Sequence, residues 1–503
     1  MSDYLHGAYG EIQSVGSRVA DDSQGAFVYI GTAPVNQVAG GAANVNKPIV
    51  VRNIAEARKY FGYSDDWASF TLCEAMHAHL ENKGVGPLVF INVLDPETHK
   101  ASSKTTVSKT PANGRITISE ASLVYLDSVV VKTTDETPET KVKGTDYSIA
   151  YSVEKEQIVI QELTSGALGT AALTVEYYLV TPSSVTDAVV VGSTDGAGLN
   201  TGVYAVGDVY TLTGYIPSFL AAPGFSSHPT VHNAMYAMSQ KINGHWDAYM
   251  FVDLPIVSGG TQLTLATAAT WKTANGYDKP NETVYFPMAL GTDDNTYHLS
   301  VLAAANFQEL LLTQDGIPFK TASNTACEII ENLYLGAEYT DRVYNDEIIN
   351  AHLNKNGIAS AAFVGGRWAI WGAHSAEYNQ TDGDDINASE TNMMMLYYIS
   401  NDFQARRILD VDRPMSGNDI RTIVSEEQTR IDALLKIGAL IFGEVYANAT
   451  EEYESDIMNG DYSFTINVTT TPLAKSLTAI VTWTDEGFVT YYEIDTNSAT
   501  DAE

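Results

Sequence analysis

Two histidines at helical spacing are the first residues in this chain that could do chemistry. His228 and His232 lie four positions apart in SHPTVHN, so on a helix they would share one face. A zinc site needs a third and a fourth ligand, and neither an HExxH pattern nor a cysteine at metal-ligand spacing supplies them. His77 and His79 are two positions apart and would point to different faces of a helix. We therefore expect no metal and no cofactor.

A second candidate is the run of carboxylates in TDGDDINASE, residues 381–390. Carboxylate oxygens are the usual ligands of calcium, but this run lacks the spacing and the central glycine of an EF-hand loop. The pattern favours an acidic surface loop.

Motifs for nucleophilic catalysis are missing from the chain. It contains no GxSxG, and its GTAP and GG segments lack the lysine and the serine or threonine with which a P-loop holds phosphates. The sequence therefore predicts no catalytic residue and no enzymatic activity.

Aromatic residues and cysteines are expected mainly in the core. Trp368, Trp371 and Trp483 stand in runs that also contain Tyr or Phe. Core packing accounts for most such positions, and a carbohydrate-stacking platform is the alternative. Cys73 and Cys327 lie far apart in apolar sequence, so we expect both to pack as small core residues.

Length and charge narrow the class of protein. A chain of 503 residues exceeds the size at which single cores stop growing, about 250–300 residues, so several domains are expected. The formal net charge is −34. Such an acidic surface repels nucleic-acid phosphates and anionic lipid head groups, so neither nucleic acid nor a membrane is an expected partner. The first residues lack a signal peptide and no apolar run reaches about 18 residues, so we expect a soluble protein made in the cytoplasm.

The elements that must position these residues begin with an α/β pattern. The runs AFVYI and PLVFINVLD are typical of buried strands and enclose helical segments at residues 54–61 and 69–83. From residue 96 to 191 the chain becomes Thr- and Val-rich with short alternating runs, which predicts an inserted all-β domain. Helix and strand patterns then return through residue 360.

Towards the C-terminus the pattern becomes mostly helical. Residues 324–335 and 344–356 are candidate helices, and GIASAAFVGGRWAIWGAHS is typical of a pair of strands. A strong amphipathic helix follows, with six apolar residues on one face: Ile420, Ile423, Val424, Ile431, Leu434 and Leu435. A final β region is expected at residues 463–495.

The predicted organisation has five parts. They are an N-terminal arm (1–24), a central α/β domain (25–95 and 192–360), the inserted β-rich domain (96–191), an α+β C-terminal domain (361–486) and a C-terminal arm (487–503). The predicted fold class is therefore mixed α/β and α+β, with several domains and an extended arm at each end.

Five segments stand in a fixed order and far apart: GAFVYIGTAPV (25–35), AAPGF (221–225), TVYFPMAL (283–290), GGRWAIWGAHS (365–375) and DEGFVTYYEID (485–495). Together they resemble the sheath proteins of contractile phage tails and of the related tail-like bacteriocins. Residues 398–443 resemble the C-terminal domain of that family. The resemblance implies a subtilisin-like central domain, which directs attention to Asp253 and His298, but no catalytic motif surrounds either residue.

The resemblance implies a structural subunit and not an enzyme. Such subunits form stacked six-membered rings around a tail tube and contract to drive the tube through a target cell envelope. The implied partners are further copies of the chain, the tail tube protein, and baseplate and tail terminator proteins. The implied location is the host cytoplasm during assembly and then the virion or a released tail-like particle. The alternatives are a type VI secretion-like sheath component, a subtilisin-like hydrolase and a surface-layer protein.

Basic residues are scarce, so their clustering within residues 401–440 is informative. This stretch holds six of the 28 Lys and Arg residues together with seven acidic residues, which makes it close to neutral. Ion pairing inside the domain is one interpretation. The other follows from the resemblance and is contact with the tail tube, for which the candidates are Arg406, Arg407, Arg413 and Lys436.

Both chain ends have β propensity but no core of their own. Apolar or β-branched residues recur loosely in one end (Ile12, Val15, Val19) and alternate regularly in the other (Phe488, Thr490, Tyr492, Ile494). These ends either pair within one subunit or cross to neighbouring subunits and complete a sheet there. The second interpretation makes all seven residues contacts of the sheath lattice.

Overall fold

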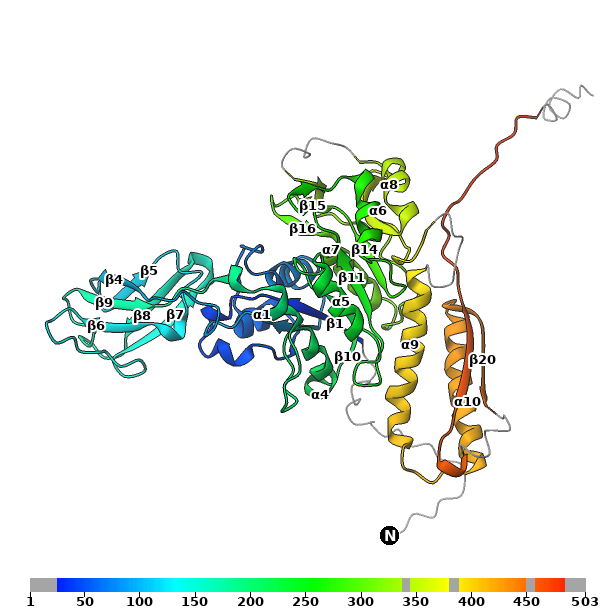
Figure 1. The fold of residues 1–503 in the computed structure, drawn as a ribbon, viewed down its shortest axis with the longest axis horizontal. Helices are drawn as coiled ribbons and strands as arrows, with labels where there is room; N and C mark the ends of the chain where they lie inside the picture. Colours follow the sequence, from blue (N-terminus) through cyan, green and yellow to red (C-terminus); the bar gives the residue numbers. More distant parts are fainter. Residues whose placement is uncertain (1–24, 337–343, 380–388, 449–456, 485–503) are drawn as a thin grey trace, which may run out of the picture. The chain divides into compact units, whose positions relative to one another are not determined.

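The structure is a computed structural model that describes residues 25–336, 344–379, 389–448 and 457–484. The two expected arms, residues 1–24 and 487–503, lie outside these ranges. By its internal contacts the chain divides into two compact units, unit 1 (Met1–Asp419) and unit 2 (Ile420–Glu503). The two units are described separately below (Figure 1).

Unit 1 is built on an eight-stranded sheet with the strand order β19-β18-β14-β11-β10-β1-β3-β2. Its strands are β1 (Gly25–Gly31), β2 (Ile49–Val51), β3 (Leu88–Asn92), β10 (Ile216–Ala221), β11 (Tyr249–Asp253), β14 (Glu282–Tyr285), β18 (Ile358–Val364) and β19 (Arg367–Trp371). The inner strands run parallel, and the edge strands β2 and β19 pair antiparallel. Strands in such a sheet have both faces covered, which is why the run LVFIN of β3 is buried at every position.

Helices of unit 1 begin and end at local signals in the sequence. Helix α1 (Ile54–Phe61) starts where the Asn53 side chain accepts a hydrogen bond from the backbone of Glu56 (2.9 Å), and it ends at Gly62, whose φ is 75°. The helix predicted at residues 69–83 is confirmed from residue 72 onwards. The helices after α1 are α2 (Leu72–Ala75) with its continuation η3 (Met76–Lys83), α3 (Asp187–Val191), α4 (Val209–Thr213), α5 (Pro229–Met238), α6 (Leu265–Ala274), α7 (Leu299–Leu312), α8 (Asp346–His352) and α9 (Glu390–Arg407). Over the described ranges, no helix has both the length and the apolar character needed to cross a membrane.

One predicted helix, at residues 324–335, is wrong. Residues Ile330–Tyr334 form strand β17, which pairs antiparallel with β15 (Met288–Gly291). The other neighbour of β15 is β16 (Thr296–His298). Apolar residues at helical spacing suggested a helix, but pairing with a distant strand decides the conformation. The expected pair of strands after residue 357 is confirmed as β18 and β19.

Six strands between residues 105 and 177 form two three-stranded sheets around a core of their own. The sheets are β4-β9-β6 and β5-β8-β7. Their strands are β4 (Thr105–Lys109), β5 (Arg115–Ile118), β6 (Val130–Thr133), β7 (Tyr147–Ser152), β8 (Gln157–Glu162) and β9 (Leu173–Tyr177). The Asn36 side chain joins this module to the main fold by donating to the carbonyls of Ser122 (2.9 Å) and Val124 (3.0 Å). Val185 and Val190, expected in the insertion, lie in the main core.

Unit 2 contains helix α10 (Gly417–Lys436) from Ile420 onwards, and a hairpin of β20 (Leu440–Ala447) and β21 (Phe464–Thr470). The predicted amphipathic helix is confirmed, since Ile423, Ile431 and Leu434 are buried on one face of α10. Gly443 of β20 approaches this face so closely that an added Cβ would lie 2.1 Å from Ile431 Cγ2. The core of unit 2 is therefore one helix face against one sheet face.

Strand β18 runs across residue 361, where the C-terminal domain was expected to begin. The compact units instead meet at residues 419 and 420. The five-part domain organisation remains a prediction.

Candidate functional site

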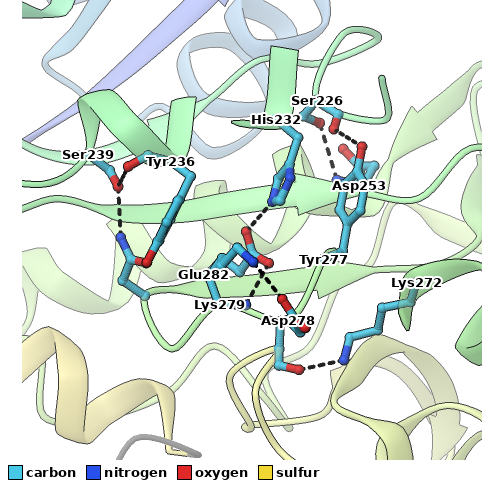
Figure 2. Close-up of polar contacts among 12 residues, drawn as sticks. Ser226, His232, Tyr236, Ser239, Asp253, Lys272, Tyr277, Asp278, Lys279 and Glu282 are labelled. Atoms are coloured by element: carbon cyan, nitrogen blue, oxygen red, sulfur yellow. Dashed lines mark hydrogen bonds and ion pairs between the residues drawn. The ribbon is translucent and has the colours of Figure 1, made fainter. Parts of the chain in front are cut away.

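The two histidines expected on one helix face lie at α5, but each is bound to a different carboxylate. His228 stands at the start of α5, where its Nδ1 lies 2.7 Å from Asp187 Oδ1. His232 is fully buried, and its Nε2 lies 2.5 Å from Glu282 Oε2. Its ring stacks on Tyr277 with 3.9 Å between ring centres (Figure 2). Across the described ranges, no group of three His, Cys, Asp or Glu side chains is placed to hold a metal ion.

The carboxylate of Glu282 belongs to a buried polar cluster that links several elements (Figure 2). The Glu282 backbone carbonyl accepts a hydrogen bond from the N–H of Ala376 at 2.8 Å. Lys272 of α6 is 5% exposed, and its Nζ donates to the carbonyl of Ala376 at 2.5 Å. Burial lowers the pKa of Lys272, and the Glu282 carboxylate opposes this effect only in part. The resulting pKa is about 8. The cluster fastens α5, α6 and the chain at Ala376 to the start of β14, which is a structural role.

Asp253 and His298 are not arranged as a hydrolase would need. Asp253, at the end of β11, accepts hydrogen bonds from the backbone N–H (3.0 Å) and the hydroxyl of Ser300. The Nδ1 of His298 lies 2.7 Å from Glu74 Oε2. Burial lowers the pKa of His298, but the Glu74 carboxylate outweighs this effect and raises the pKa to about 9. Ser300 donates to a carboxylate and not to His298, so this group lacks the hydrogen bond that activates a serine nucleophile.

The acidic run at residues 381–390 lies mostly outside the described residues, and Glu390 at its end is not on a surface loop. Glu390 is the first residue of α9 and is 4% exposed. Its carboxylate accepts hydrogen bonds from the hydroxyls of Thr283 (2.9 Å) and Thr321. The expected surface loop is therefore wrong for Glu390, because the first turn of α9 packs against β14.

Tryptophans and cysteines divide between core and surface. Trp368 and Trp371 of β19 are partly buried and pack against the main core, as expected, whereas Trp483 in unit 2 is 77% exposed. Cys73 and Cys327 are buried and form no disulfide, which confirms their expected role in packing.

The four tube-contact candidates are distributed over both units. Arg406 of α9 pairs with an aspartate one turn earlier at 2.8 Å. Arg407 and Arg413 each lie 3.3 Å from a carboxylate oxygen of Asp410. Lys436 ends α10 in unit 2, is exposed, and forms no ion pair with the acidic side chains that the structure describes. Three of the four candidates therefore already have a partner inside unit 1.

Unit 2 exposes strand edges and apolar side chains. In the part of the chain that is described, the hairpin of β20 and β21 has no further strand on either edge. One face is held to α10, where the backbone N–H of Val445 donates to Gln428 Oε1 at 2.9 Å. Ile441, Phe442 and Tyr446 of β20 are 61%, 48% and 44% exposed. Open edges of a small sheet are the usual places for strand addition.

The chain after β21 is extended and exposed. Residues 471–484 form no helix or strand, and Leu477, Ile480 and Val481 are 90–92% exposed. The predicted final β region is thus confirmed at β21, and residues 471–484 are not part of it. Seven arm candidates lie outside the described residues: Ile12, Val15, Val19, Phe488, Thr490, Tyr492 and Ile494.

Comparison with known proteins relates this chain to sheath proteins. No protein-family model matches it. Over 271 residues, 53% of the chain, it is 30% identical to the tail sheath protein of Burkholderia phage BcepMu. The resemblance to contractile tail sheath proteins is confirmed. The chain spans about half the length of this curated relative, 51%.

Among solved structures, one sheath structure has a similar fold. The helical sheath of the anti-feeding prophage in its contracted state matches 96% of this chain and 100% of that chain, with a TM-score of 0.52 and 12% identity. A sheath tail protein from Desulfitobacterium hafniense matches 88% of this chain and 93% of that one, with a TM-score of 0.49 and 11% identity. At 12% identity the first match shows the fold alone, a mixed α/β fold of several domains.

For a chain similar to tail sheath proteins, the exposed strand edges and apolar side chains of unit 2 are the features to examine next. Sequence reasoning named Arg406 and Arg407 of α9 as tube-contact candidates, which stays a prediction, and did not single out the exposed residues of β20 or of residues 477–481. The run LTAIVTW carried a usable signal, because it is apolar, rich in β-branched residues and free of charge. The buried Glu282 and Lys272 carried no such signal, because their partners are distant in sequence.

Proposed function

We propose that the chain is the structural subunit of a contractile tail sheath and performs no enzymatic step. Copies polymerise as stacked six-membered rings around a tail tube and shorten to drive the tube through a target cell envelope. The observation that carries this proposal is the fold, which matches a contracted helical sheath over 96% of the chain. The 30% identity with a phage tail sheath protein supports it.

The proposed partners are further copies of the chain, the tail tube protein, and baseplate and tail terminator proteins. The proposed location is the host cytoplasm during assembly and then the virion or a released tail-like particle. A formal net charge of −34 supports assembly without nucleic-acid or membrane contacts, since it disfavours both surfaces.

The two chain ends are the proposed lattice contacts. Each end adds as a strand to the open hairpin of β20 and β21 on a neighbouring subunit, and each added backbone hydrogen bond contributes about 0.5–1.5 kcal/mol net. The open edges and the exposed apolar residues of unit 2 support this assignment. Exchanged strands keep subunits connected while rigid bodies rotate.

The tube contact is proposed at Arg406, Arg407, Arg413 and Lys436. Since the three arginines have carboxylate partners in unit 1, their contribution is reduced, and Lys436 is the strongest of the four candidates. Replacing Arg406, Arg407 and Lys436 by Glu should weaken tube binding most at low salt, because exposed charges are screened beyond about 10 Å at 0.1 M. A triple variant that coats tubes as well as the parent protein at low salt rejects these residues and leaves the sheath function untouched.

A subtilisin-like architecture is proposed for the central domain, supported by the parallel inner strands of the main sheet. Likeness of fold carries no activity by itself. The hydrogen bonds of Ser300 and His298 argue against the hydrolase alternative. An active-site serine probe that labels the purified protein would reverse this conclusion.

Negative-stain microscopy of the purified protein tests the proposal. We expect tubes or stacked rings from this chain alone or with its tube protein. A type VI-like component would need a second sheath chain to form them. A protein that stays monomeric at high concentration, with and without the tube protein, contradicts the proposed function.

A further inference from the structure

A buried carboxyl group fastens the first turn of α9 to the main sheet. The Thr283 hydroxyl of β14 donates to Glu390 Oε2 at 2.9 Å, and the Thr321 hydroxyl donates to Glu390 Oε1. The Thr321 oxygen accepts from the backbone N–H of Ser323 at 2.9 Å. The Tyr249 hydroxyl of β11 lies 2.9 Å from the Thr283 oxygen. Strand β14 and a loop therefore bind the carboxyl group directly, and β11 contacts it through Thr283.

Among the described residues, no positively charged side chain compensates the charge of an ionised Glu390. The titratable groups that face it are Tyr249 of β11 and Tyr285 of β14, and burial followed by the Glu390 charge raises the pKa of both phenols. Both tyrosines therefore stay neutral. Glu282, the residue before Thr283 in β14, is already paired with His232.

Two further groups that lie near Glu390 in the chain or the fold are Lys320, whose side chain is exposed, and His374. The Nζ of Lys320, the residue before Thr321, lies 5.3 Å from the ring centre of Phe319. His374 bridges Ser389 through the backbone, and its ring stacks on Tyr378 with 3.7 Å between ring centres. Among the described residues, the partners of an ionised Glu390 carboxylate are thus the hydroxyl groups of Thr283 and Thr321.

We propose that Glu390 is a proton-dependent latch that holds the first turn of α9 on the main sheet. The protonated carboxyl group is neutral and can both donate and accept a hydrogen bond, so the threonine hydroxyls satisfy it in the buried position. After loss of the proton, the same position holds an uncompensated charge, and opening the turn returns that charge to water. Protonation favours the closed turn, and deprotonation favours the open one.

The direction of the pH effect follows from the position of the carboxyl group. Burial raises the pKa of Glu390 to about 7 from an ordinary value of 4.5, against the hydrogen bonds from Thr321 and Thr283, which lower it. Between these values the closed turn keeps its proton and the open turn has lost it. Closure is therefore fully favoured below pH 4.5 and weakens as the pH rises through about 7. The chain leaves unit 1 through α9, so the latch holds the element that leads to unit 2.

Hydrogen exchange of the full-length protein tests the latch. Peptides covering residues 390–397 are compared at pH 5.5 and pH 8.5, after correction for intrinsic exchange rates. With pKa values of 4.5 open and about 7 closed, the opening equilibrium of the wild type increases about 30-fold between these two pH values. Glu390→Gln cannot ionise, so this increase disappears. Glu331→Gln, which changes an exposed glutamate of β17, is the matched control and keeps the wild-type response.

A second variant separates the latch from a merely structural role. Thr321→Val removes a donor that stabilises the charged carboxylate, so the pH midpoint of opening moves upward. The proposal is overturned if Glu390→Gln opens as steeply with pH as the wild type, or if Thr321→Val leaves the midpoint unchanged. Should Glu390→Gln fail to fold, the direction of the Thr321→Val midpoint decides alone.

Discussion

Unit 1 and unit 2 bury their sheets to very different extents. The main sheet of unit 1 has eight strands with a continuous aromatic core, in which Phe27 stacks on Phe219 with 4.6 Å between ring centres. Unit 2 has two strands on one helix, and much of β20 is exposed. A two-stranded sheet is marginally stable in water by itself. We therefore expect unit 1 to hold most of the stability of the monomer, and the proposed strand addition by other copies would complete the small sheet of unit 2.

Removing the chain ends is the strongest test of this contrast. A chain without residues 1–24 and 485–503 should lose tube formation entirely, because the open edges of β20 and β21 then have no strands to accept. Because the proposed function places the ends on neighbouring subunits, the melting transition of the monomer should stay unchanged. Microscopy and calorimetry together check both statements. Tubes from the shortened chain, or an unfolded monomer, would break the comparison.

A Phe→Ala substitution in unit 1 and one in unit 2 should lower the free energy of unfolding by very different amounts. Phe251 is 1% exposed and lies 5.9 Å from Phe27 and 6.0 Å from Phe307 between ring centres. Phe251→Ala should therefore cost about 3–5 kcal/mol in the free energy of unfolding. Phe442 is 48% exposed, and Phe442→Ala should change monomer stability by less than about 0.5 kcal/mol while weakening assembly. Urea unfolding measures both, and equal losses would contradict the assignment of stability to unit 1.

The pH dependence of unit 1 should reveal the pair formed by the partly buried His298 and the buried Glu74. Because the pKa of His298 is raised to about 9, its stabilising effect is complete below the ordinary value of 6.5 and is lost as the pH rises through 9. The free energy of unfolding of the wild type should exceed that of His298→Gln by up to about 3 kcal/mol at pH 6. Above pH 9 the two free energies should approach each other. A constant difference over this range would show that the histidine acts through packing alone.

Arg413→Ala should have the smallest effect. Its side chain is 65% exposed and pairs with Asp410 at 3.3 Å, and such surface pairs contribute about 0.2–1 kcal/mol. We expect a loss below about 0.5 kcal/mol that shrinks further at high salt, since exposed charges are screened. Thermal melting at two salt concentrations checks this. A loss above about 2 kcal/mol would mean that the end of α9 is more tightly built than its exposure indicates.

Features that depend on near neighbours could be predicted from the sequence. Helix α1 was visible in its apolar spacing and in its stop at Gly62, and the face of α10 was visible in the spacing of Ile423, Ile431 and Leu434. The ion pair between Arg406 and Asp402 was predictable for the same reason, because residues four apart on a helix meet. Local periodicity carried this information.

Features that depend on distant residues could not be predicted. Residues 330–334 have apolar spacing compatible with a helix, yet their pairing with β15 makes them a strand. His232 gains Glu282 as its partner across 50 positions, and Glu390 is buried by threonines 107 and 69 positions away. Nothing near these residues in the sequence shows whether a carboxylate faces water or a hydroxyl.

By itself the sequence determined the class of fold, the acidic charge and the family resemblance, because composition, periodicity and segment order are properties of the chain alone. Tertiary structure alone decided which polar groups are buried and which strand edges stay open in the described hairpin of unit 2. The physical reason is that the burial of a polar group and the pairing of a strand depend on neighbours that are distant in the sequence.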